Sequence, residues 1–141
     1  MPAAASDRPG ALGRLHHVGI VSPSEDRAVA LMALLGFEEK YRGFVPQYEA
    51  LCIFTEGNGG SPVELVVPSG GVLAEFNRGV GGLHHIALEV DSLASTAEEF
   101  AARGIRLLES QPVKGAGNFL CNFMPPEHTR GVIVEYVEEL G

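Results

Sequence analysis

The chain has 141 residues, 45% of them hydrophobic and 20% charged, which fits one compact globular domain with a substantial core. Its formal net charge of −8 disfavours nucleic-acid binding, because that function needs a basic face. No apolar run approaches the roughly 20 residues of a membrane span, and two cysteines are too few for a disulfide framework, so we expect a cytoplasmic protein.

The first half of the chain is expected to combine strands with one helix. Residues 1–13 are small and polar, and we expect a disordered tail there. The elements expected after it are a strand at 15–21, a helix at 25–35, and paired strands at 48–54 and 63–67. Ser22 is expected to cap the helix and Gly36 to end it.

The second half is expected to repeat this order after a glycine-rich linker. Residues 69–81 form the linker, with a short helix inside it. The elements expected after it are a strand at 83–90, a helix at 92–103, and strands at 105–108, 119–124 and 132–137. Asp91 is expected to cap the second helix and Gly104 to end it.

A long internal repeat supports this division. The segment Arg14-Leu15-His16-His17-Val18-Gly19-Ile20-Val21 returns 68 positions later as Gly82-Leu83-His84-His85-Ile86-Ala87-Leu88-Glu89. Likewise, Val63-Glu64-Leu65-Val66 returns as Val134-Glu135-Tyr136-Val137. A repeat of this length is too long for a solenoid unit and indicates two copies of one βαβββ module. We therefore predict an α+β fold in one domain at residues 14–138, with module one at 14–68 and module two at 82–138.

Each copy of the repeat carries two adjacent histidines and one glutamate on strand-like runs. Histidine and glutamate are common ligands of divalent metals. Neighbouring residues of a strand point to opposite faces, so only one histidine of each pair can face the interior. Glu64 and Glu135 each interrupt an apolar strand, and the alternative to metal binding is that they lie on a solvated face. The duplicated placement favours a metal site.

The chain resembles the vicinal oxygen chelate superfamily of glyoxalases and dioxygenases, and within it the methylmalonyl-CoA epimerase family. The resemblance covers about residues 14–138 and rests on the repeated motifs together with Lys114-Gly115-Ala116-Gly117 and Gly131-Val132-Ile133-Val134-Glu135. It implies a cupped mixed sheet with helices outside, around one divalent metal ion per chain. The ligands that it implies are His17, Glu64, His85 and Glu135, which leaves His16 and His84 on the opposite face. Cobalt, manganese, nickel, iron and zinc all suit such ligands.

The resemblance also bears on the residues that would meet the substrate. It places Glu49 near the glutamate that removes a proton in the epimerases; the alternative is a solvent-facing glutamate on a strand. The segment 114–118 resembles the loop that lies over the substrate in that family, and the alternative is an ordinary turn. Pro125-Pro126-Glu127 departs from the usual His-Pro-Lys, so an acid stands where the family has a lysine for the phosphates of coenzyme A.

The function implied is that of a metal-dependent epimerase or isomerase, which removes the α-proton of methylmalonyl-CoA or a related acyl thioester. The metal would chelate two vicinal oxygens and stabilise the negative charge that develops. Two alternatives stay open, because fold does not determine function. One is another metalloenzyme of the superfamily, either a glyoxalase-type isomerase or a ring-cleaving dioxygenase. The other is a metal-free protein that binds a small-molecule drug. We expect a homodimer without a nucleic-acid or membrane partner.

Overall fold

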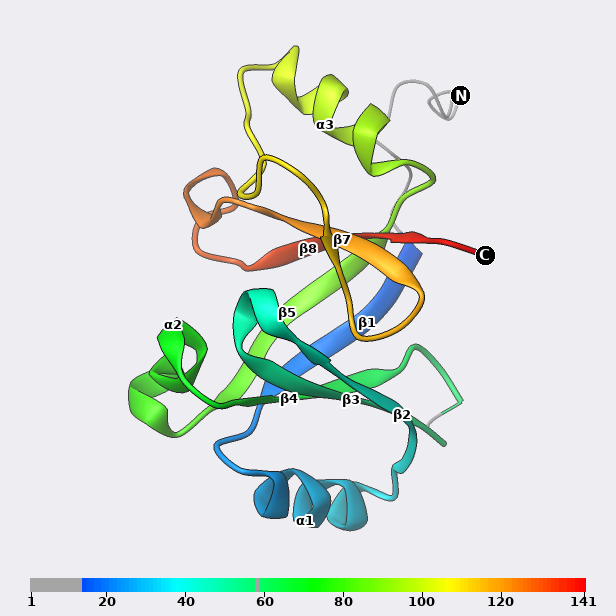
Figure 1. Cartoon of the computed structure of the whole chain (residues 1–141), viewed down its shortest axis with the longest axis vertical. Helices are drawn as coiled ribbons and strands as arrows, with labels where there is room; N and C mark the ends of the chain where they lie inside the picture. Colours follow the sequence, from blue (N-terminus) through cyan, green and yellow to red (C-terminus); the bar gives the residue numbers. More distant parts are fainter. Residues whose placement is uncertain (1–13, 58) are drawn as a thin grey trace. The chain divides into compact units, whose positions relative to one another are not determined.

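A computed structural model describes residues 14–57 and 59–141, so the tail predicted at 1–13 lies outside the described residues. The chain forms two compact units (Figure 1). The first unit comprises His17–His85 and Gly115–Gly117, and the second comprises residues 14–16, Ile86–Lys114 and Asn118–Gly141. Each contains strand, helix and three strands in chain order, which confirms the predicted pair of βαβββ modules and the α+β class. That residues 14–138 act as a single domain stays a prediction.

The first unit contains a mixed four-stranded sheet in the order β2-β3-β4-β1. Its elements are β1 (Arg14–Val21), α1 (Glu25–Leu35), β2 (Glu38–Val45), β3 (Ala50–Glu56), β4 (Val63–Pro68) and α2 (Gly71–Ala74), with 3-10 turns at Pro46–Tyr48 and Phe76–Gly79. Strand β1 runs parallel to β4, and β3 runs antiparallel to both β2 and β4. The short helices after β4 match the predicted linker helix.

Helix α1 covers this sheet and closes the core of the first unit (Figure 1). Ala28 and Met32 are buried on its inner face and pack against Ile53 of β3 and Leu65 of β4. The helix has the predicted bounds and ends at Gly36, whose φ of 78° is readily adopted by glycine. The cap is Ser24 and not Ser22, since the Ser24 side chain accepts a hydrogen bond from the backbone of Arg27.

Strands β2 and β3 differ from the prediction. We assigned no element to Glu38–Val45, whose charged start gives no alternation of apolar and polar residues. This segment is the strand that completes the predicted βαβββ module, and it forms the edge of the sheet of the first unit. We expected β3 to begin at residue 48, but a 3-10 turn ends at Tyr48 and Glu49 takes a left-handed conformation with a φ of 51°. The strand therefore begins at Ala50, and Glu49 precedes it.

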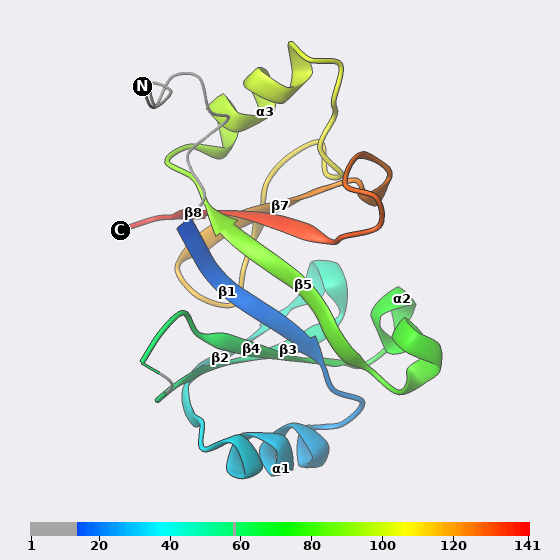
Figure 2. The ribbon, with the colours of Figure 1, turned by 180° about the vertical axis from the view of Figure 1, so that it is seen from behind.

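The second unit repeats the order of elements. They are β5 (Gly82–Glu89), which enters this unit at Ile86, α3 (Leu93–Ala101), β6 (Val113–Lys114), β7 (Phe119–Met124), a 3-10 turn at Pro126–His128 and β8 (Val134–Glu139). The strand order is β5-β8-β7-β6, with β5 and β8 parallel. Helix α3 lies beside β7 and β8 (Figure 2). Its buried Phe100 packs with Leu107, Met124 and Val134 in the core of this unit.

Two further predictions in the second unit were wrong in detail. Ser92, and not Asp91, caps α3 by accepting a hydrogen bond from the backbone of Ser95. Residues 105–108 form no strand. The Leu108 N–H does bond to the carbonyl of Phe123 on β7, but the next contact is made by a side chain: the Asn122 amide pairs with both the N–H and the carbonyl of Glu109. No helix in the described part of the chain is long and apolar enough to cross a membrane.

Candidate metal centre

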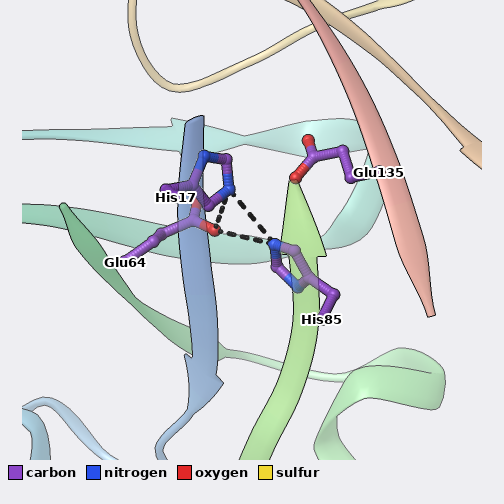
Figure 3. Close-up of side chains that lie close together, drawn as sticks. All are labelled: His17, Glu64, His85 and Glu135. Atoms are coloured by element: carbon purple, nitrogen blue, oxygen red, sulfur yellow. Dashed lines mark hydrogen bonds and ion pairs between the residues drawn. The ribbon is translucent and has the colours of Figure 1, made fainter. Parts of the chain in front are cut away.

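Three of the four predicted ligands converge inside the first unit. His17 lies on β1, Glu64 on β4 and His85 on β5, and each is less than 10% exposed. Strand pairing brings His17 and Glu64 together. Strands β1 and β4 are parallel, and Glu64 is paired with Gly19. Gly19 lies two residues after His17, so it is on the same face of β1. The three side chains point toward one another in Figure 3.

The facing nitrogen and oxygen atoms of these side chains form a nearly equilateral triangle. Nε2 of His17 lies 3.2 Å from Nε2 of His85, and each of these nitrogens lies 3.3 Å from Oε1 of Glu64 (Figure 3). With bonds of about 2.1 Å to one ion, two ligand atoms are about 3.0 Å apart at right angles and about 3.4 Å apart at the tetrahedral angle. All three edges fall within this range, so the residues present fit a divalent metal.

The electrostatics of Glu64 fit the same interpretation. Burial alone would raise the pKa of its carboxyl, but hydrogen bonds and charge interactions with His17 and His85 outweigh burial and hold the pKa below its usual range. The side chain is therefore a carboxylate at neutral pH. A buried carboxylate with two imidazole nitrogens aimed at the same point supplies both the charge and the lone pairs that a divalent cation needs.

The rings of His17 and His85 pack against neighbouring residues of the first unit. The ring of His17 packs edge-on against Phe54 of β3, with ring centroids 5.0 Å apart, and Phe54 stacks on Tyr41 of β2. On the other side, the ring of His85 lies against Gly19, where a Cβ would come 2.6 Å from its Nε2. We did not predict a role for Gly19, although the repeat carries a signal for one: the matching residue is Ala87, another small side chain.

Glu135 belongs to the second unit. It lies on β8, is buried, and is paired with Ala87 of β5. This register matches that of the first unit, where Glu64 lies opposite Gly19. In both units, the glutamate therefore faces the residue two positions beyond the second histidine of the repeat.

The neighbouring histidines, His16 and His84, are half-buried, whereas His17 and His85 are buried, so the expected alternation along β1 and β5 is present. Glu49 lies outside the converging group. Its side chain is exposed, and its carboxylate lies against Gly70 and Gly71 at the start of α2.

The predicted substrate loop lies in the first unit although the strands on either side of it belong to the second. The carbonyl of Ala116 approaches Gly43 of β2, where a Cβ would lie 2.6 Å from the oxygen. Gly117 lies against the ring of Tyr41, where a Cβ would come 2.5 Å from the hydroxyl. The small residues of this loop therefore allow it to pack directly on β2.

Comparison with known proteins defines the class. A family model for the Glyoxalase/Bleomycin resistance protein/Dioxygenase superfamily matches residues 16–123. The chain belongs to this superfamily, as the sequence motifs predicted.

Several similar proteins within this superfamily are epimerases. The mitochondrial methylmalonyl-CoA epimerase of Bos taurus is 31% identical, over 94% of this chain and 81% of its own length. The ethylmalonyl-CoA/methylmalonyl-CoA epimerase of Cereibacter sphaeroides is 32% identical, over 88% of this chain and 96% of its own length. The crystal structure of methylmalonyl-CoA epimerase from Mycobacterium tuberculosis aligns with a TM-score of 0.83 at 25% identity, covering 91% of this chain and 89% of that one.

Proposed function

We propose that this protein is a metal-dependent epimerase that acts on methylmalonyl-CoA or a related acyl thioester by removing the α-proton. The observation that carries the proposal is the buried triangle of ligand atoms from His17, Glu64 and His85, in a chain whose relatives are named as epimerases of such thioesters.

We propose Glu135 as the fourth ligand of one divalent ion per chain. Two observations support this role of Glu135. The residue is buried on β8, and it is paired with Ala87 of β5 in the same way as Glu64 is paired with Gly19 of β1. Two imidazoles and two carboxylates suit cobalt, manganese, nickel, iron or zinc. The bound ion would supply Lewis acidity, which stabilises the negative charge that develops on the substrate oxygens when the α-proton leaves.

Glu49 is the proposed base. The residue is exposed, so a substrate can reach it. Its backbone is held by Ser69, whose N–H and hydroxyl both donate to the Glu49 carbonyl. In this mechanism the Glu49 carboxylate takes the α-proton, and a second acid returns a proton to the opposite face of the carbon.

The substrate class is kept wider than one compound because of Glu127. This exposed acid lies in the 3-10 turn Pro126–His128, at the position where the epimerase family usually has a lysine. An acidic side chain there would repel the phosphates of coenzyme A. The proposed substrates therefore include acyl thioesters other than methylmalonyl-CoA. We also propose that the protein is cytoplasmic and forms a homodimer. Size-exclusion chromatography with light scattering would test the dimer.

Two measurements test the function. Protein purified without chelators should carry close to one divalent ion per chain. When incubated with methylmalonyl-CoA in deuterated water, it should exchange the α-proton, and a chelator should stop the exchange until metal is restored. Metal without exchange, together with turnover of a glyoxalase or dioxygenase substrate, would move the protein to another branch of the superfamily. A protein that never holds metal and only binds small molecules would contradict the proposal altogether.

A further inference from the structure

The two nitrogens of His85 face two different partners. Its Nε2 points to Glu64 and His17, whereas its Nδ1 lies 2.8 Å from Nδ1 of the preceding residue, His84. The rings of His84 and His85 are nearly perpendicular, with centroids 5.1 Å apart. Adjacent residues of a strand point to opposite faces, yet here the two rings meet through their Nδ1 atoms.

From this contact we infer that His84 is a positioning residue, which accepts a hydrogen bond from Nδ1–H of His85 and so presents the Nε2 lone pair of His85 to the metal. The inference rests on the metal site proposed above. A neutral imidazole has one N–H and one lone pair. If Nε2 of His85 binds a cation, its proton is on Nδ1, and Nδ1 of His84 must then accept. His84 therefore carries its own proton on Nε2.

The ring of His84 is itself held in place. The Phe76 ring packs edge-on against it, with centroids 4.7 Å apart. The turn that carries Phe76 is closed by two hydrogen bonds: the Gly81 N–H donates to the Phe76 carbonyl, and the Asn77 side chain donates to the Gly81 carbonyl. His84 thus joins a packed turn to the metal ligand. Contacts of this kind orient the imidazoles that bind a metal, and their loss typically lowers metal affinity by about 10–100-fold.

The first copy of the repeat supplies a matched control. His16 precedes the ligand His17 as His84 precedes His85, but its ring packs against Phe119 and its Nε2 lies 3.5 Å from the Glu139 carboxylate. His16 and His84 therefore occupy equivalent positions in the repeat but have different neighbours. Replacing His16 should leave metal affinity within about threefold of the wild-type value, because Phe119 and Glu139, which lie beside its ring, are not among the proposed ligands.

The test measures binding of cobalt(II) alone, by competition with a chelator of known affinity, in the full chain and in His84→Leu, His84→Asn and His16→Leu. Leucine removes the acceptor, whereas the asparagine oxygen stands as many bonds from Cα as Nδ1 of histidine does. We expect His84→Leu to weaken cobalt binding about tenfold or more and to change the cobalt absorption spectrum. Asparagine should restore most of the affinity. Melting of the metal-free proteins checks that each variant folds.

A second measurement does not depend on any variant. In the zinc-loaded wild-type protein, nitrogen-15 NMR of the histidine rings should show His85 protonated on Nδ1 and His84 on Nε2. Equal cobalt affinity of the wild type and a folded His84→Leu, equal loss in the Leu and Asn variants, or a His85 proton on Nε2 would each overturn the inference. A wild-type protein that binds neither metal would overturn the proposed metal site as well, so the two failures are distinguishable.

Discussion

The imidazole of His85 occupies the space that a side chain at Gly19 would need. A Cβ on Gly19 would lie 2.6 Å from Nε2 of His85, well inside van der Waals contact. Gly19 is buried in β1, opposite Glu64. The absence of a side chain at this one position therefore lets β1 and the ring of His85 on β5 approach closely.

Gly19→Ala should weaken metal binding about tenfold or more, because the added methyl must push the His85 ring away from its aligned position. Cobalt competition checks this. Gly60→Ala is the control, since nothing lies within 4 Å of a Cβ there and its φ is not in the left-handed region. Equal affinity of Gly19→Ala and the wild type would show that the ring can shift without consequence for the metal.

Glu135→Gln should lower metal affinity by removing the negative charge of the proposed fourth ligand. We expect a loss of at least about tenfold, with activity falling together with metal content. Glu98→Gln, a change of the same kind at an exposed position of α3, should have no effect on either quantity. Metal analysis after dialysis measures the metal content, and exchange of the α-proton of methylmalonyl-CoA measures the activity. Retention of a full equivalent of metal by Glu135→Gln would remove this residue from the ligand set.

Part of this architecture could be predicted because the sequence repeats it. Strands β1, β4, β5 and β7 are largely apolar runs, and β8 begins at the end of the apolar residues 132–134. The repeat placed a histidine and a glutamate at matching positions of each module. The edge strand β2 was not predicted, because its start is charged and carries no alternation. Contacts that depend on side-chain rotamers, such as that between His84 and His85, cannot be derived from strand alternation alone.

The strand wrongly predicted at 105–108 has a physical explanation. Its Leu107 is buried and Leu108 bonds to the backbone of β7, as a strand residue would. Beyond that bond, the buried Asn122 side chain replaces the backbone as the partner of Glu109. An apolar pattern reports burial but not which group completes the backbone hydrogen bonds.

Asn122→Ala should therefore destabilise the fold. The Asn122 oxygen accepts from the N–H of Glu109 at 2.9 Å, and its amide donates to the Glu109 carbonyl at 3.0 Å. Without these bonds the free energy of unfolding should fall by about 1–3 kcal/mol, because partly buried backbone groups lose their partner. Urea unfolding measures the change, with the exposed Asn118→Ala as the control. A change no larger than that of the control would show that water satisfies Glu109 equally well.

Glu49→Gln tests the proposed base separately from the metal ligands. The substitution preserves size and hydrogen bonding but removes the carboxylate that takes the α-proton. Turnover of methylmalonyl-CoA and exchange of its α-proton should fall by roughly a hundredfold or more, the scale of a general base. Metal content should stay at the wild-type level, because Glu49 is exposed and lies outside the converging group of His17, Glu64 and His85. Glu56→Gln, at the exposed end of β3, is the matched control and should leave both quantities unchanged. If Glu49→Gln retains normal turnover while Glu135→Gln loses metal and activity together, the metal mechanism stands and the base is a different residue.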